Sequence, residues 1–132
     1  MIEVKDIVKS FDGNVVLDHI STILRDGEVN MIIGQSGSGK TVMLKSLIGL
    51  HAVDSGSILY DGRDIAQMSE EEIRMLHREV GVLFQGSALF DSMSVIENVL
   101  FPMEMFSHQS KEDMRSRAEF CLRRVEMPEH IW

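Results

Sequence analysis

The sequence predicts an α/β fold in which antiparallel hairpins come first, a strand, a glycine-rich loop and a helix follow, and a helical segment ends the 132-residue chain. Three observations support this prediction. Aspartate-glycine pairs separate apolar stretches in the first half, which is typical of β-hairpins. A glycine-rich loop stands between a strand-like apolar run and a helix-like run. Helical patterning replaces strand patterning beyond about residue 85.

Strands are expected at residues 2 to 10, 15 to 24, 28 to 33, 57 to 60 and 79 to 84. The turn signals between them are Asp12-Gly13-Asn14, Asp26-Gly27 and Asp61-Gly62. The run Val29 to Ile33 follows the second of these turns and is nearly all apolar. Such a run is typical of a parallel strand buried on both faces.

Four helical segments are expected. The stretch Thr41 to Leu50 is apolar on nearly all sides, as in a helix packed inside a domain. Ser69 and Glu72 form a capping box that opens a short helix with Ile73 and Leu76 inward. Ser94 and Glu97 form a second capping box. A further helix runs from Ser110 to about Glu126, with one apolar face made of Met114, Ala118, Cys121, Leu122 and Val125.

Residues 34 to 41 match the phosphate-binding pattern G-x-x-x-x-G-K-[ST] at every fixed position. Glycines allow successive backbone N–H groups to curl round a phosphate, the lysine reaches the β- and γ-phosphates, and the hydroxyl holds Mg²⁺. A helix that begins here points its positive dipole end at the phosphates. The alternative is a glycine-rich loop that only turns the chain. The motif predicts nucleotide binding through Gly34, Gln35, Ser36, Gly37, Ser38, Gly39, Lys40 and Thr41.

Composition narrows the class of protein. The formal net charge of −8 and the lack of a basic stripe argue against a nucleic-acid partner. The single cysteine, Cys121, excludes an internal disulfide and fits a small buried apolar residue. The N-terminus lacks the features of a secretory signal, and no apolar stretch approaches the length of a membrane span. Any membrane association is therefore expected to come through a partner.

The order of these elements and motifs resembles the ATP-binding domain of ABC transporters over essentially the entire chain. The resemblance implies a P-loop NTPase core of the ABC type with an N-terminal antiparallel β subdomain and the start of a helical subdomain, truncated before the signature motif. Residues 1–85 would hold the β subdomain and the core up to the Q-loop, and residues 86–132 the incomplete helical subdomain. The implied cofactors are ATP and Mg²⁺.

The resemblance also assigns roles to residues outside the P-loop. Phe11, in the first hairpin, takes the place of the family's adenine-stacking aromatic, and Val16 is a weaker candidate for the same pocket. Stacking of a base on an aromatic ring contributes about 1 to 3 kcal/mol in nucleic-acid analogues. Gln85, after the apolar run 81 to 84, matches the Q-loop glutamine, which contacts Mg²⁺ and the attacking water. Lys40 and Gln85 are the implied catalytic residues, and Thr41 and Gln85 the implied Mg²⁺ ligands. The alternatives are a hairpin-core role for Phe11 and a surface position for Gln85.

Two segments resemble a subgroup of the family, the ATPase subunits of lipid importers that work with Mce-type substrate-binding proteins. These are Val42-Met43-Leu44-Lys45 and residues 86–95, followed by Glu97-Asn98-Val99 and Phe101-Pro102. The implied partners are a second ATP-binding subunit in a head-to-tail dimer and a transmembrane permease, with a location on the cytoplasmic face of the inner membrane. The permease would dock near residues 89–105 on an apolar set formed by Leu89, Phe90, Met93, Val95, Phe101, Met103 and Met105.

Three family elements have no counterpart in the sequence: the signature, the second acidic strand and the switch histidine. His130 follows no apolar acidic strand and does not qualify as the switch. Hydrolysis by these 132 residues alone is therefore not expected, and an exposed apolar edge at Val29 to Ile33 would lower solubility. Other functions remain open: an ABC-type ATPase of DNA repair or translation, a GTPase or nucleoside kinase, and a nucleotide-binding module without catalysis.

Overall fold

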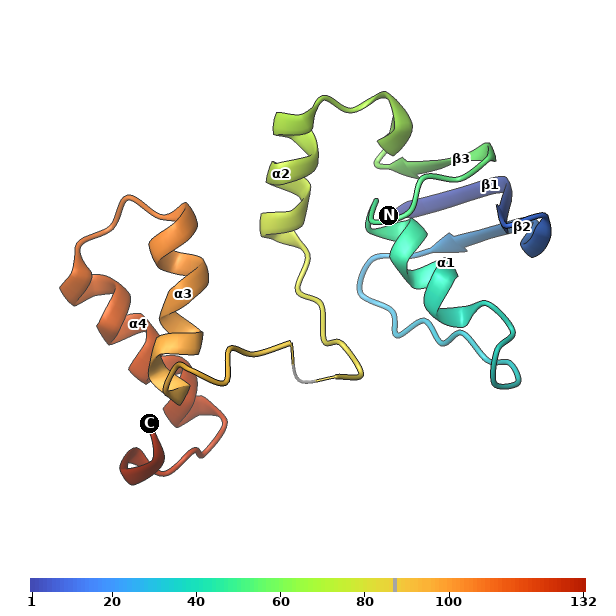
Figure 1. The fold of residues 1–132 in the computed structure, drawn as a ribbon. Helices are drawn as coiled ribbons and strands as arrows, with labels where there is room; N and C mark the ends of the chain where they lie inside the picture. The colour runs from blue at the N-terminus through green and yellow to red at the C-terminus, as the bar shows by residue number, and fades with distance from the viewer. Residues whose placement is uncertain (87) are drawn as a thin grey trace. The chain divides into compact units, whose positions relative to one another are not determined.

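The computed structural model describes residues 1–86 and 88–132 in two compact units, Met1–Val82 and Leu83–Trp132 (Figure 1). Ser87 belongs to the segment 86–95 that carries part of the family resemblance, and it lies outside the described residues. The first unit holds a β-sheet with the helices α1 (Lys40–Leu47) and α2 (Glu70–Glu79). The second unit holds the helices α3 (Val95–Phe106) and α4 (Lys111–Arg124) and ends in the short 3₁₀ turn Glu129–Ile131.

The sheet is antiparallel throughout, in the order β2-β1-β3-β4. Its strands are β1 (Ile2–Phe11), β2 (Asn14–Leu24), β3 (Ser55–Tyr60) and β4 (Arg63–Asp64). Two-residue turns at 12–13 and 61–62 close the β1–β2 and β3–β4 hairpins, and both residues of each turn have positive φ. Asp-Gly is favoured in such turns because both central positions require the left-handed region. The strands predicted at 2 to 10, 15 to 24 and 57 to 60 are confirmed.

The core of the first unit lies between one face of this sheet and α1, with α2 at its edge. Its buried members are Val4, Ile7, Leu17, Met43, Leu47, Ile58, Tyr60 and Leu76. Tyr60 also ties the sheet to α1, because its hydroxyl donates a hydrogen bond to the Leu47 carbonyl oxygen at 2.7 Å. Burial raises the pKa of the Tyr60 hydroxyl. A short 3₁₀ turn, Ile65–Gln67, leads from β4 toward α2.

Both predicted capping boxes are present. Ser69 and Ser94 each accept a hydrogen bond from the N–H three residues on, and Glu72 and Glu97 accept from the serine N–H groups in return. These hydrogen bonds lower the pKa values of both glutamates. In the second unit, Asn98 binds the loop before α3, accepting from Phe90 N at 2.8 Å and donating to three carbonyls.

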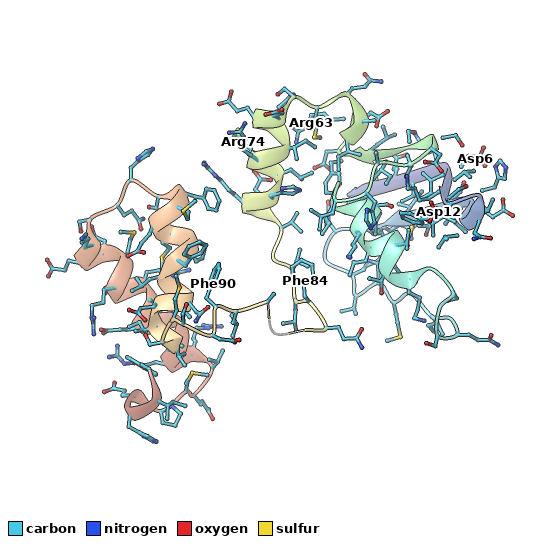
Figure 2. All side chains as sticks on the ribbon, viewed as in Figure 1. Asp6, Asp12, Arg63, Arg74, Phe84 and Phe90 are labelled. Atoms are coloured by element: carbon cyan, nitrogen blue, oxygen red, sulfur yellow. The ribbon has the colours of Figure 1, made fainter. Side chains whose placement is uncertain are left out.

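The two helices of the second unit pack together, and the inward face of α4 contains Met114, Ala118 and Leu122. Phe90, labelled in Figure 2, precedes α3 in the chain. Its ring lies against the ring of Phe101, with 4.7 Å between the ring centroids. The prediction that Val125 belongs to the apolar face is wrong, since this side chain is 68% exposed. The reason is local: α4 ends at Arg124, and Val125 is the C-cap, where the helical repeat no longer fixes its direction.

Two predicted strands are absent from the described residues. Residues 28–33 form no ladder with any strand of the sheet, and Val29 and Ile33 are 96% and 85% exposed. Residue 79 is the last residue of α2, and residues 80–84 are irregular, with Leu83 96% exposed. A parallel strand forms only when neighbouring strands satisfy its N–H and C=O groups, and no described strand pairs with either segment.

The helix after the glycine-rich loop is also shorter than predicted. It ends at Leu47 rather than at Leu50, because Gly49 has φ +73° and the amide of Leu50 turns back to the Lys45 carbonyl oxygen at 2.8 Å. One face of α1 is buried, whereas Leu44 and Leu50 are exposed. The all-round apolar character of residues 41–50 therefore does not correspond to all-round burial.

Candidate nucleotide-binding site

The glycine-rich loop turns the chain directly into α1. Gly37 and Gly39 have φ values of +78° and +88°, which favour glycine, and Gly39 is the N-cap of the helix. Within the turn, Ser38 N donates to the Gln35 carbonyl oxygen at 3.2 Å, and Met43 N donates to the Gly39 carbonyl oxygen at 2.8 Å. The first turn of α1 carries no acidic side chain. The positive end of the helix is therefore free of a competing carboxylate from its own first turn.

Two glycines of the loop lie close to their neighbours, and at Gly39 the neighbour is backbone. A Cβ atom on Gly39 would lie 2.9 Å from the Val16 carbonyl oxygen and 3.0 Å from Val16 Cγ1. A Cβ atom on Gly34 would overlap the hydroxyl of Ser38. The structure thus brings Val16, a predicted cofactor-binding residue, against the last glycine of the loop. Gly39 can take this position only because it has no side chain.

The lysine of the motif folds back over the loop. Lys40 Nζ donates to the Gly34 carbonyl oxygen at 2.8 Å and to the Gln35 carbonyl oxygen at 2.6 Å. An ammonium group has three donors and no acceptor, so these bonds place its charge against the backbone of the loop. Thr41 follows on the exposed first turn of the helix. The lysine, the threonine and the loop amides therefore come from one short stretch of chain.

Phe11 is not a core residue of its hairpin, since 39% of it is exposed. Its ring meets the ring of His51 edge-on, with the centroids 5.5 Å apart and an interplanar angle of 72°. Lys9 Nζ lies 5.3 Å from the centroid of the Phe11 ring and 2.8 Å from Asp54 Oδ1. An aromatic ring with partly open surface suits stacking on a flat ligand.

Sequence reasoning missed His51, Lys9 and Asp54 as neighbours of Phe11. His51 and Asp54 lie in the loop between α1 and β3, about 40 residues beyond the hairpin, and no local pattern in the sequence marks such a contact. Hydrogen bonds from the Lys9 side chain and from Ser10 N–H hold the pKa of Asp54 below its usual value. The carboxylate is thereby kept in its charged form.

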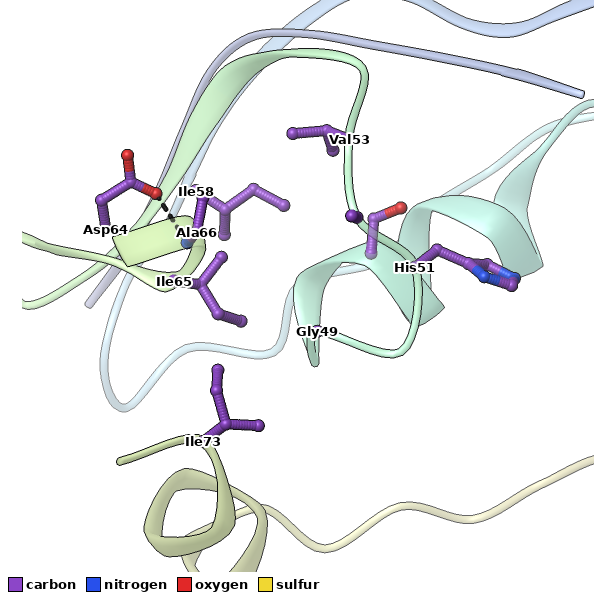
Figure 3. A pocket seen from close by; sticks show the side chains of 10 residues that line it. Gly49, His51, Val53, Ile58, Asp64, Ile65, Ala66 and Ile73 are labelled. Carbon is purple, nitrogen blue, oxygen red and sulfur yellow. Dashed lines mark hydrogen bonds between the residues drawn. The ribbon is translucent and has the colours of Figure 1, made fainter. Parts of the chain in front are cut away.

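Among the described residues, two cavities include side chains of α1 in their lining. One, of about 310 Å³, lies beside the P-loop and is lined by Leu17, Ile20, Thr22, Met31, Ile32, Ile33, Ser38, Gly39, Lys40 and Met43. The other, of about 110 Å³, is lined mainly by apolar side chains of the loop after α1, of β3 and of α2 (Figure 3). Ser46 faces this second cavity, and its fully buried hydroxyl has no hydrogen-bond partner among the described residues.

Gln85 belongs to the second unit, where its backbone is irregular and its side chain is exposed. Its approach to Thr41 and to the P-loop therefore stays a prediction. Among the residues that the structure describes, no group of three or more His, Cys, Asp or Glu could hold a metal ion. The candidate Mg²⁺ ligands are the hydroxyl of Thr41 and the amide of Gln85. No described helix is long and apolar enough to cross a membrane.

Comparison with known proteins relates this chain to ATP-binding proteins of the ABC transporter family. The sequence model of the ABC transporter family matches residues 17–131. A relative in Mycobacterium leprae (strain TN), "Probable ribonucleotide transport ATP-binding protein mkl", is 41% identical over 114 residues, which are 86% of this chain and 33% of the relative. The "Methionine import ATP-binding protein MetN" of Clostridium acetobutylicum is 33% identical over 131 residues, which are 99% of this chain and 41% of the relative.

A solved structure, the dimeric ATP-binding cassette MJ0796 in a post-hydrolysis state bound to ADP and Pi, superposes with a TM-score of 0.88 at 27% identity. The match covers 99% of this chain and 60% of that chain. The fold and the P-loop define an ABC-type nucleotide-binding domain. The chain belongs to the ABC transporter family. It spans about a third of the length of the mycobacterial relative.

Proposed function

We propose that this chain is the nucleotide-binding part of an ABC importer ATPase subunit and that it binds Mg-ATP through its P-loop. The observation that carries the proposal is the loop 34–41, where two left-handed glycines and the backbone-bound Lys40 open directly into α1. The relatives named above are described as ATP-binding proteins of ribonucleotide transport and methionine import.

The residues present fit a bound triphosphate. Gly39, where a side chain would clash with the Val16 backbone, allows the close backbone approach that a phosphate cradle requires. Backbone N–H groups from Ser36 to Thr41 would hold the phosphate oxygens, and Lys40 would exchange its two carbonyl partners for the β- and γ-phosphates. Phe11 would stack on adenine.

Mg²⁺ bound with the nucleotide neutralises the charge on the phosphates. Thr41 would hold this ion through its hydroxyl, and Gln85 through its amide oxygen, while the Gln85 amide nitrogen remains able to donate a hydrogen bond. Val16, which lies beside Gly39, would be a weaker contact in the adenine pocket. In the complete subunit, Lys40 and Gln85 would serve hydrolysis, and a second copy in a head-to-tail dimer would complete the site.

The permease is proposed to dock on the second unit near residues 89–105. Leu89, Phe90 and Met105 are exposed there, and methionine-rich surfaces adapt well to a partner helix. Such a contact would hold the subunit on the cytoplasmic face of the inner membrane. Exchanging Leu89 for aspartate is expected to abolish co-purification with the permease and to leave ATP binding intact; retained co-purification would contradict this docking site.

The transported substrate is proposed to be a lipid, on the resemblance of residues 42–45 and 86–95 to subunits of Mce-type lipid importers. Inactivating the gene in the source organism and measuring uptake of labelled phospholipid, methionine and ribonucleoside side by side tests this assignment. Loss of phospholipid uptake alone is expected. Loss of methionine or ribonucleoside uptake alone would assign the subunit to that substrate instead.

A thermal-shift titration with Mg-ATP, Mg-GTP and no nucleotide, with free phosphate followed in the same wells, tests nucleotide binding. Stabilisation by ATP is expected, and at a hundredfold excess of ligand over its dissociation constant the gain is about 2.7 kcal/mol. Preference for GTP, or no shift with either nucleotide, would contradict the proposal. Phosphate release by the 132 residues would show that hydrolysis does not need the signature and the acidic strand.

A further inference from the structure

We infer that the loop between α1 and β3 positions Phe11 for adenine, with His51 and Asp54 as positioning residues. The inference rests on the proposed function, since it requires that Phe11 stack on the base. It adds to that function two residues that bind the aromatic hairpin to the helix of the P-loop.

The first contact is between rings. Phe11 is the last residue of β1, next to the hairpin turn, and about two-fifths of it is exposed. A side chain in that position would sample several rotamers without a neighbour. His51 is that neighbour, because its ring meets the Phe11 ring edge-on with 5.5 Å between the centroids. His51 also lines the adjoining cavity, where its imidazole points away from the labelled isoleucines (Figure 3).

The second contact is ionic and involves the backbone. Asp54 Oδ1 accepts from Lys9 Nζ at 2.8 Å, and Asp54 Oδ2 accepts from Ser10 N at 2.6 Å. Its own N–H donates to the Val8 carbonyl oxygen at 2.8 Å. One aspartate thus holds three consecutive residues of β1 just before Phe11. The side chain of Lys9 is mostly buried, and its ammonium group lies 5.3 Å from the centroid of the Phe11 ring.

The loop that carries His51 and Asp54 is itself fixed to α1. Leu50 N and His51 N both donate to the Lys45 carbonyl oxygen, at 2.8 and 3.3 Å. A continuous path of hydrogen-bonded chain therefore runs from Lys40, at the start of α1, to the hairpin that ends in Phe11. The stretch from Lys40 to Asp54, about 15 residues long, therefore connects the phosphate-binding loop to the strand that carries Phe11.

Holding an aromatic side chain in its binding rotamer before the ligand arrives lowers the entropy cost of association. Removing the His51 ring or the Asp54 charge is expected to weaken ATP binding about two- to tenfold, which corresponds to the ordering of one side chain. Binding of the phosphates alone should not change, because neither side chain forms a hydrogen bond with the P-loop among the residues that the structure describes.

The experiment compares Mg-ATP with Mg-tripolyphosphate, which lacks a base, by calorimetric titration of the chain. The variants are His51→Ala, Asp54→Asn and Phe11→Ala, with His108→Ala as the matched control on an exposed helix-linking loop. His51→Ala and Asp54→Asn should weaken the binding of Mg-ATP and leave the binding of Mg-tripolyphosphate unchanged. His51→Phe should bind Mg-ATP as the unaltered chain does. In a Phe11→Ala background, His51→Ala should cause no further loss of ATP affinity.

Equal loss of affinity for Mg-ATP and Mg-tripolyphosphate would overturn the inference, because it would reveal a general structural role for the loop. Unchanged ATP affinity in His51→Ala and Asp54→Asn, with Phe11→Ala still defective, would overturn it and leave adenine stacking standing. Unchanged ATP affinity in Phe11→Ala would instead refute the stacking role itself. If His51→Ala fails to fold by circular dichroism, Asp54→Asn carries the same comparison of the two ligands.

Discussion

Substituting Gly39 by alanine tests the geometry of the P-loop most sharply. Alanine at φ +88° has a backbone cost of about 1–2 kcal/mol. Its Cβ atom would also lie 2.9 Å from the Val16 carbonyl oxygen, which belongs to the backbone of β2 and not to the flexible end of a side chain. Overpacking of this kind typically adds about 1–3 kcal/mol. Gly39→Ala is therefore expected to destabilise the first unit by about 2–5 kcal/mol.

Gly37 provides the matched control. Its φ of +78° is nearly the same, but an added Cβ atom would meet nothing within 4 Å, so Gly37→Ala should show only the backbone cost of about 1–2 kcal/mol. Urea unfolding followed by circular dichroism measures both variants, and an unchanged slope with denaturant would confirm that only stability differs. Equal losses in the two variants would refute the close packing of Val16 against the loop.

Three further predictions concern stability. Ser46→Ala should raise the free energy of unfolding by about 1 kcal/mol, because it removes a buried hydroxyl without a partner among the described residues; a loss measured by urea unfolding would mean that this hydroxyl is satisfied. Tyr60→Phe should cost about 1 kcal/mol and leave the Leu47 carbonyl unpaired. The pKa of Tyr60 is higher in the folded state, so its protonated hydroxyl stabilises the fold fully at any pH below the unfolded pKa of about 10. This stabilisation is lost as the pH rises through the folded pKa. The fall in melting temperature at alkaline pH should therefore be smaller in Tyr60→Phe. Ser69→Ala should cost about 1 kcal/mol through loss of the α2 cap, and an unchanged melting temperature would contradict that role.

Features determined by local chemistry could be predicted from the sequence. The turn at Asp61-Gly62, the capping box of Ser69 and the helix directly after the P-loop each depend on a few consecutive residues, and all three are confirmed, although the helix begins at Lys40 and not at Thr41. The family followed from the P-loop and the order of the hairpins, and the match to residues 17–131 confirms it. The predicted fold class, an ABC-type α/β domain, is confirmed as well.

Features that depend on distant residues could not be predicted in this way. The runs at 28–33 and 80–84 have strand-like composition, but a parallel strand also needs neighbours, and the described sheet offers them none. His51 and Asp54 meet Phe11 and Lys9 only because β3 pairs with β1, which no local pattern in the sequence reveals. Burial of the 28–33 run was expected from its apolar side chains, whereas burial is decided by the partner strand.

The account's central claim is that Lys40 and its loop bind the phosphates of ATP. The most direct measurement is equilibrium binding of a labelled ATP analogue to the chain and to Lys40→Ala, with Lys45→Ala, another lysine of α1, as the control. The account predicts that Lys40→Ala abolishes binding, while Lys45→Ala binds as the unaltered chain does and both variants keep their secondary structure. Unchanged binding by a folded Lys40→Ala variant would contradict the assignment of this loop as the nucleotide site.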